Sequence, residues 1–424
     1  MNKAICVWLT LALPAARAQH LPPIRPIGQI ERVSAEPLSS ATTVVALNDG
    51  RVYVNDAVTR RVLLFDSTLS RARAVADSTS ATAKAYGTQS GTLIAFRGDS
   101  ALFVDPASRS MLVLGPDGKI DRVIAMPKTD AGPLLQFNLA EGVPGFDARG
   151  RLISLMSAVG PRAPQANPGT TVFQAPDSAL LVGFDLISRT IDTIGGVRTS
   201  FPRMTFVRDA NGNVTSITGT PVLLPVVDSW AIEHDGTVVA VRGRDFHVDR
   251  LGADGQWHSG PKLPFSWEHL SNDAKTALID SAAAAMKARR DSMAAGLLHE
   301  PTPPPPPGAG ALRGRSGGAG SSAAPPPALI DGRPALADLP DYKPAFRPAA
   351  ARADVDGNLW VKTTALDHGQ PVYDIVSAAG VLIDRVKLPQ FRTIAGFGPG
   401  VVYLAVVDPD KVVHLERAPI KRKS

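Results

Sequence analysis

The chain repeats one short pattern of apolar and polar positions six times. In the first copy, alternating apolar residues at 44–47 lead to the turn Asn48-Asp49-Gly50, and further apolar runs follow at 52–54 and 62–65. Such runs are typical of strands with a buried face, and Asp-Gly turns supply the positive φ that hairpins require. The pattern therefore predicts antiparallel strands joined by tight turns along most of the chain.

The spacing of the copies predicts the architecture. Their turn glycines are separated by 48, 52, 86, 121 and 43 residues, and they are Gly50, Gly98, Gly150, Gly236, Gly357 and Gly400. The short gaps match one four-stranded propeller blade, which takes ~40–50 residues. We therefore expect an all-β fold, a six-bladed β-propeller, in which the two long gaps contain insertions.

The long gaps contain three recognisable segments. A self-contained hairpin pattern occupies about 201–225. One amphipathic helix is expected at about 271–298, because Ser271 suits an N-cap, Asp273 suits the helix start, and apolar residues recur at spacings of four or seven. We expect this apolar stripe to pack on the flank of the propeller, and exposure to a partner is the alternative. Residues 301–327, rich in Pro and Gly, predict a flexible, disordered loop.

The N-terminus has the features of a signal peptide at 1–18. Lys3 precedes an apolar stretch at 5–13, and Ala16-Arg17-Ala18 forms a small-x-small cleavage site. The stretch is far shorter than the ~20 residues of a membrane-spanning helix, so we expect no transmembrane segment. The alternative, a buried N-terminal helix, is interrupted by Pro14. We expect an exported protein, periplasmic or extracellular, whose residues 19–424 form a single propeller.

The segment at 27–33 is expected to close the ring of blades. The sixth copy offers three strand patterns, near 393–397, 401–406 and 411–417, which is one short of a full blade. An open ring would leave an apolar strand edge unpaired. We therefore predict that 27–33 pairs as the fourth strand of the last blade, and a disordered N-terminus is the alternative.

Charge and cysteine content restrict the chemistry. The formal net charge is +6, but seven basic residues lie in the signal, the Pro/Gly-rich loop and the C-terminal tip, and subtracting them leaves about −1. No nucleic-acid footprint is therefore expected. The single cysteine, Cys6, lies in the predicted signal, so the mature chain offers no disulfide, thiolate metal site or cysteine nucleophile.

The chain resembles the six-bladed propellers of the NHL-repeat and TolB-like group. The resemblance is strongest at 43–126 and 352–417, and the stretch 354–361, Asp-Val-Asp-Gly-Asn-Leu-Trp-Val, looks like the start of a blade in exported bacterial members without assigned activity. These motifs consist of turn and core residues. The resemblance therefore implies the fold and says almost nothing about function.

Motifs for catalysis are weak. Six-bladed propellers include calcium-dependent lactonases, but Glu141-Gly142 is followed here by Val143 and departs from the Glu-Gly-Pro signature of that family. The eight histidines form no zinc motif, and His247 and His414 fit satisfied strand residues better than catalysts. Ser316 matches a GxSxG motif by letter, but it lies in the Pro/Gly-rich loop, where no scaffold holds it. We predict no metal site and no cofactor.

The remaining candidate site is the mouth of the propeller axis. Asp228, Trp230, Arg352 and Arg392 stand at or just before the entries of inner strands. An acid, an aromatic ring and two guanidinium groups around one mouth would suit a small anionic or polar ligand. The alternative is a structural ring of ion pairs that closes the tunnel.

These observations favour an exported, monomeric binding or interaction module without catalysis. Its partner would be a small polar ligand or an envelope protein. The alternative is a hydrolase or lyase with a metal-dependent site on the axis, so catalysis is left open. A third interpretation is a member of an envelope complex that uses the helix and the Pro/Gly-rich loop as an arm.

Overall fold

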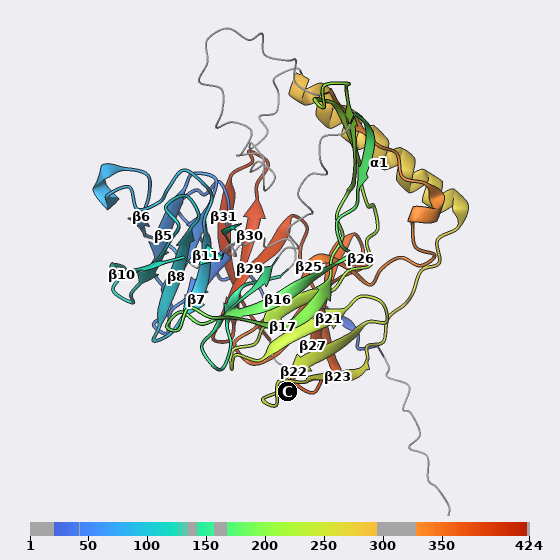
Figure 1. The fold of residues 1–424 in the computed structure, drawn as a ribbon. Helices are drawn as coiled ribbons and strands as arrows, with labels where there is room; N and C mark the ends of the chain where they lie inside the picture. The colour runs from blue at the N-terminus through green and yellow to red at the C-terminus, as the bar shows by residue number, and fades with distance from the viewer. Residues whose placement is uncertain are drawn as a thin grey trace, which may run out of the picture.

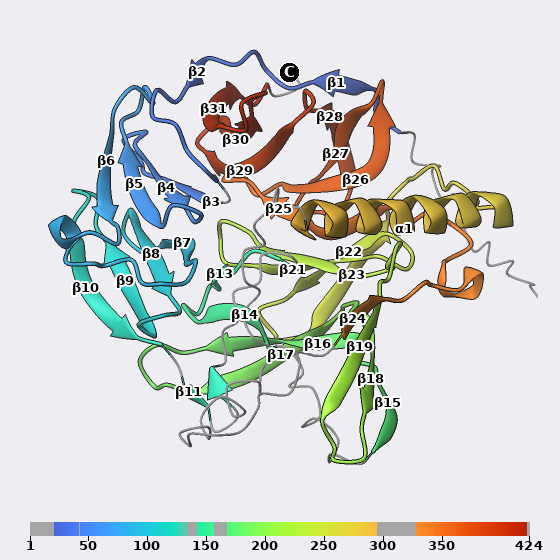
Figure 2. The same cartoon turned by 90° about the horizontal axis from the view of Figure 1, so that it is seen from above.

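The structure is a computed structural model that describes residues 21–41, 43–126, 128–129, 132–133, 142–156, 168–294 and 328–421. The predicted signal at 1–18 and the predicted loop at 301–327 lie outside these residues. Within them the fold is a β-propeller, and Figure 2 shows its sheets arranged around a common centre. The all-β propeller expected from the repeats is therefore confirmed.

Three ring sheets come from the N-terminal half, and each is a meander whose first strand lies at the centre of the ring. The first sheet contains β3 (Thr43–Ala46), β4 (Val52–Asp56), β5 (Arg61–Phe65) and β6 (Ala72–Ala76), and the short helix η1 (Ser80–Thr82) follows it. The second contains β7 (Thr92–Phe96), β8 (Ser100–Asp105), β9 (Ser110–Leu114) and β10 (Ile120–Ala125). After the small hairpin of β11 (Lys128–Thr129) and β12 (Gly132–Pro133), the third contains β13 (Gly145–Phe146), β14 (Leu152–Met156), β16 (Ser178–Phe184) and β17 (Ile191–Arg198).

Three further ring sheets come from the C-terminal half. The fourth contains β20 (Ser229–Ile232), β21 (Val238–Arg242), β22 (His247–Leu251) and β23 (Trp257–Lys262). The fifth contains β25 (Phe346–Ala353), β26 (Leu359–Asp367), β27 (Gln370–Val376) and β28 (Leu382–Lys387), with β1 (Ile24–Pro26) at its outer edge. The sixth contains β29 (Arg392–Gly398), β30 (Val401–Val407) and β31 (Val413–Pro419), with β2 (Arg32–Val33) outermost.

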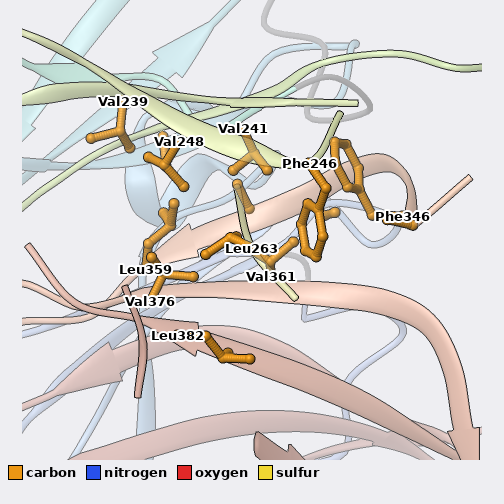
Figure 3. Close-up of a cluster of buried hydrophobic side chains, with 14 residues drawn as sticks. Val239, Val241, Phe246, Val248, Leu263, Phe346, Leu359, Val361, Val376 and Leu382 are labelled. Atoms are coloured by element: carbon orange, nitrogen blue, oxygen red, sulfur yellow. The ribbon is translucent and has the colours of Figure 1, made fainter. Parts of the chain in front are cut away.

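Apolar clusters fill the space between neighbouring ring sheets. The cluster in Figure 3 joins Val241 and Phe246 of the fourth sheet to Phe346 and Val361 of the fifth. Comparable clusters join every other consecutive pair, including the sixth sheet and the first. Because strand side chains alternate between two faces, each ring sheet contributes one apolar face to the cluster before it and one to the cluster after it. This explains why the strand patterns read as nearly continuous apolar runs.

Arginine side chains tie neighbouring ring sheets together at their turns. Each donates from a guanidinium nitrogen to a carbonyl oxygen in a turn of the next sheet. The contacts are Arg417 to Ser67 at 2.9 Å, Arg73 to Gly118 at 3.0 Å, Arg97 to Gly150 at 3.2 Å, Arg149 to Ala253 at 3.3 Å and Arg250 to Ser377 at 3.0 Å. These arginines supply hydrogen-bond donors to carbonyl groups in the turns, which lie outside the strand ladders.

The N-terminal segment joins the last two ring sheets. Arg32 and Val33 pair antiparallel with Arg417 and Glu416 of β31, as predicted for 27–33, although the ladder is only two residues long. An unexpected second contact precedes it, because β1 pairs in parallel with β28. Between them the chain passes so close to Pro419 that a Cβ on Gly28 would lie 2.4 Å from the Pro419 carbonyl oxygen. We call residues 24–33 the strap.

A second, smaller body rises from one face of the propeller (Figure 1). Its sheet, which we call the insertion sheet, has the order β15 (Gly169–Phe173), β18 (Arg203–Arg208), β19 (Val214–Thr220) and β24 (Ala328–Asp331). β18 and β19 form an antiparallel hairpin within 201–225, whereas the strands β15 and β24 on either side of it were not predicted. No residue described in β15, β18 or β19 is buried.

The predicted helix is present as α1 (Asn272–Ala294), and the Ser271 hydroxyl accepts the backbone N–H of Ala274 as an N-cap. Its buried residue Ile279 packs with Leu224, Leu270 and Leu339. These partners lie in the segments that connect the ring to the insertion sheet. The helix was expected to pack on the flank of the ring. The apolar contacts of Ile279 are instead with these connecting segments, so that expectation is wrong. The insertion sheet, α1 and the short helix η3 (Leu336–Asp338), with their connections, are called the insertion layer.

Candidate functional site

The four residues predicted at the axial mouth lie on three different ring sheets. Asp228 precedes β20, Trp230 lies in β20, Arg352 lies in β25, and Arg392 begins β29. Each of these strands is the first of its sheet, and β20 and β25 lie side by side in the ring. Among the described contacts, no hydrogen bond or ion pair joins any two of the four residues. Their environments differ, and each is described in turn.

The carboxylate of Asp228 belongs to a network of ion pairs. It accepts from Arg242 at 2.8 Å and from the backbone N–H of Gly243 and Arg198. Arg242 also contacts Asp249 at 2.6 Å. Burial acts to raise the pKa of Asp249, but hydrogen bonds from Ser259 and Arg242 outweigh it and hold that pKa below its ordinary value. The charge of Asp228 is therefore compensated inside the protein.

The indole of Trp230 is part of the apolar core. It is 1 % exposed and packs between the third and fourth ring sheets with Leu155 and Leu181. Its backbone pairs with Gly142, where a Cβ would lie 2.3 Å from the indole Nε1. Among the described residues that Nε1 has no hydrogen-bond partner. This environment makes Trp230 a packing residue between two sheets.

The guanidinium of Arg392 is held by Glu416. Two nitrogens donate to the two carboxylate oxygens at 2.6 and 2.9 Å, and a third contact reaches the carbonyl oxygen of Gln390 at 3.2 Å. Such a bidentate pair is among the stronger charge-assisted contacts in proteins. Because Glu416 lies on β31, the pair fastens the first strand of the sixth sheet to its third. Arg392 therefore has little capacity left for a ligand.

Arg352 is different from the other three, because no acidic side chain compensates it. Within the described part of the chain it makes no ion pair, and its one hydrogen bond runs to the carbonyl oxygen of Ala351 at 3.4 Å. Ala351 faces the fourth sheet, so the alternation of β25 turns Arg352 to the opposite side, toward the sixth sheet. Burial lowers the pKa of Arg352.

The titratable group whose charge acts on the pKa of Arg352 is the phenol of Tyr373. Tyr373 lies on β27 and is 3 % exposed, and burial raises its pKa to about 12 although the charge of Arg352 opposes the shift. The phenol is therefore neutral at physiological pH and leaves the arginine charge uncompensated. This neighbour was not predicted from the sequence. Tyr373 lies on β27, the strand next to β26, where Trp360 is the register partner of Arg352, and the sequence pattern does not show this register.

A second polar cluster surrounds His247 on β22. Its Nδ1 lies 2.9 Å from Asp245 and its Nε2 lies 3.0 Å from Asp249. The hydroxyl of Ser259 donates to Asp249 at 2.6 Å, so serine and histidine contact the same carboxylate and do not form a nucleophile and base. The sequence places an acid two residues before and two residues after the histidine, at 245 and 249, and this spacing could have predicted the cluster. This cluster extends the Asp228–Arg242–Asp249 network.

Metal-ligating side chains do not converge in the part of the chain that the structure describes. No group of three or more His, Cys, Asp or Glu residues there is arranged to hold an ion. Glu141, the residue weighed against the lactonase signature, lies outside the described residues. His414 contacts Asp408 at 3.4 Å. Of the three charged residues predicted at the axial mouth, Arg352 is the one without an ion-pair partner among the described residues.

Comparison with known proteins gives only distant likeness. No protein-family model and no curated protein matches the sequence. Similar solved structures include virginiamycin B lyase from Staphylococcus aureus, at 9 % identity and a TM-score of 0.39 over 92 % of this chain and 99 % of that one. Regucalcin from Agrobacterium tumefaciens matches at 10 % identity and 0.38, over 94 % and 100 %. A luciferin-regenerating enzyme matches at 11 % and 0.38, over 92 % and 97 %. We assign the fold from the sheet topology and assign no activity from these structures.

Proposed function

We propose that the protein is an exported, monomeric six-bladed propeller that binds a small anionic ligand on its axis through Arg352. Six blades are supported by the ring sheets described above and by the apolar clusters between them. The single observation that carries the function is the uncompensated guanidinium on the first strand of the fifth sheet. Carboxylates and phosphates are the groups that match its planar fork.

The physical reason is the cost of a desolvated charge. Arg352 is only partly exposed, and a cation that loses part of its hydration without gaining a partner is unfavourable, so proteins normally pair it with an acid. The chain does so for Arg242 and Arg392, but not for Arg352. An anionic ligand would supply the missing partner, and the apolar cluster between the fifth and sixth sheets, which contains Trp360, would strengthen the attraction.

The setting of this function follows from the sequence. The signal pattern at 1–18 supports export, and the near-neutral folded part supports a small ligand over nucleic acid. None of the described helices is long and apolar enough to cross a membrane. An envelope protein docked on the insertion layer remains compatible with the same axial site, because that layer rises from one face only.

A hydrolase or lyase is the second candidate. The same observation supports it, because a guanidinium that binds an anionic group of a substrate serves catalysis as well as storage or transport. Virginiamycin B lyase and the luciferin-regenerating enzyme bear enzyme names, but their likeness to this chain is too distant to decide between the two functions. Addition of EDTA distinguishes a metal-dependent enzyme from a binding protein without a metal. A fall in melting temperature that calcium reverses would favour a metal-dependent enzyme.

The test uses a panel of acetate, citrate, phosphate and sulfate, titrated into the mature protein while the melting temperature is followed. At least one anion should stabilise the wild type, by ~2.7 kcal/mol at a hundred times its dissociation constant. Arg352→Gln should lose this stabilisation. Arg347→Gln is the matched control, because Arg347 lies on the same strand but is exposed.

Two results would overturn the assignment. One is equal stabilisation of the wild type and Arg352→Gln by every anion. The other is a loss of stabilisation in Arg347→Gln as large as in Arg352→Gln, which would indicate general charge screening.

A further inference from the structure

A small cavity lies at the base of the insertion sheet, away from the axis. It has a volume of about 170 Å³ and is formed where the start of β18 and the end of β19 meet the segment at 334–339. An engineered cavity of comparable size, ~150 Å³, accommodates benzene, whereas drug-sized ligands need ~300 Å³ or more. The cavity therefore suits a small metabolite.

The lining of the cavity combines one positive and one negative side chain with apolar walls. Arg203 begins β18, and Asp338 ends η3. Leu223 and Leu339 supply apolar surface, and Gln174 and Thr220 supply neutral polar groups. The formal charge of the lining is therefore zero, and its two charges come from segments more than a hundred residues apart.

The two charged groups are only loosely engaged with each other. A single contact of 3.4 Å joins Arg203 to Asp338, and the side chains are 46 % and 41 % exposed. Asp338 also accepts the backbone N–H of Ala335, which fixes its carboxylate in place. The contact is longer than the ~2.7–2.9 Å of a tight charge-assisted bond, and an Arg–carboxylate pair can have two such bonds. A ligand can therefore displace the contact between Arg203 and Asp338 with little loss of free energy.

We propose that this cavity binds a small zwitterion of the amino-acid class with an apolar side chain. Its carboxylate would accept from Arg203, its ammonium group would donate to Asp338, and its side chain would lie against Leu223 and Leu339. A cavity lined by one charge of each sign discriminates against both anions and cations, because either one would displace the contact between the two side chains and leave one protein charge without a partner. This site is independent of Arg352.

The experiment is a calorimetric titration of the mature protein with L-leucine and two analogues. 4-Methylpentanoate lacks the ammonium group, and leucine amide lacks the carboxylate. We expect saturable binding of leucine and at least tenfold weaker binding of both analogues. Arg203→Gln and Asp338→Asn should each weaken leucine binding at least tenfold. Arg203→Lys, which keeps the charge but loses the planar fork, should bind with intermediate affinity.

The control variant is Arg333→Gln. Arg333 pairs with Asp280 in the same insertion layer, with side chains 61 % and 57 % exposed, and it does not line the cavity. It should bind leucine as the wild type does. The proposal is overturned if leucine shows no saturable binding, if either analogue binds as well as leucine, or if Arg203→Gln binds unchanged. Retained leucine binding in Arg352→Gln would separate this site from the axial one.

Discussion

The ring sheets and the insertion layer are stabilised in different ways. The largest fully buried side chains, Trp360, Tyr53 and Phe103 among them, all belong to the ring, whereas the insertion sheet buries none of its described residues. The ion pairs named here also differ in how exposed their acidic side chains are. Glu416 in the ring is 7 % exposed, while Asp280 and Asp338 in the insertion layer are 57 % and 41 % exposed. The ring therefore depends on burial throughout, whereas the insertion layer has one small buried cluster, around Ile279, and depends otherwise mainly on exposed contacts.

This difference has a physical consequence for the stability of each region. Apolar burial contributes ~25 cal/mol per Å² removed from water, whereas an exposed ion pair contributes ~0–1 kcal/mol. The insertion layer should consequently open locally at a lower free energy than the ring, as regions with few buried contacts do. Such a layer can adapt to a ligand or partner while the ring keeps its geometry. Three experiments test this difference between the ring and the insertion layer, and a fourth tests the axial site.

The largest effect is expected from removal of residues 19–34. The deletion takes away the strap, which pairs with both β28 and β31 and buries Ile27. Two ring sheets would then present unpaired outer edges, and exposed edges promote association. We expect aggregation or a large fall in melting temperature, measured by size-exclusion chromatography and thermal scans. A monomer that melts like the parent would show that the strap does not close the ring.

A matched pair of Phe→Ala variants measures the contrast directly. Phe103 is 0 % exposed in a ring cluster, and Phe206 of the insertion sheet is only partly buried. Phe103→Ala should lower the free energy of unfolding by ~3–5 kcal/mol, as in other cores. Phe206→Ala should lower it by only ~1 kcal/mol, because less surface is removed from water. Urea unfolding measures both. Equal losses would contradict the difference between the two regions.

The sequence predicted the ring well because its signals are local. Each Asp-Gly or Asn-Asp-Gly turn joins strands that are neighbours in the chain, so the pattern at 44–65 already contains β3, β4 and β5. The insertion sheet is different. β19 pairs in parallel with β24, which joins residue 216 to residue 328, and no local pattern encodes that register. The same holds for β1 on β28.

The candidate site was predictable only as a set of positions. Asp228 and Arg392 do stand at inner-strand entries, but Arg242, the partner of Asp228, lies on the neighbouring strand, and Glu416, the partner of Arg392, lies two strands away in the same sheet. Register decides which charges meet, and the sequence does not show it. Arg352 became distinctive only when the structure showed that no acid reaches it. The cavity at Arg203 and Asp338 was not predicted at all, because its two walls are distant in sequence.

A smaller, pH-dependent effect is expected from Asp374 in the ring. Burial raises the pKa of Asp374 to about 6, against ~3.9 in an unfolded chain, although Arg385 opposes the shift. A raised pKa means that this carboxyl favours the folded state below pH 4 and that its contribution is lost as the pH rises through 6. Relative to Asp374→Asn, the wild type should lose on the order of 2 kcal/mol of unfolding free energy between pH 4 and 7. Parallel pH profiles for the two proteins would contradict this.

The most direct test of the axial site is the stability of Arg352→Met in a buffer free of carboxylate and phosphate. If Arg352 is an uncompensated cation kept for an anionic ligand, removing its charge relieves a desolvation cost while the aliphatic part of the side chain is largely retained. We predict that the variant is more stable than the wild type by ~1 kcal/mol in urea unfolding. A variant less stable than the wild type by a similar amount would show that the arginine is a structural group, and the axial binding site would be refuted.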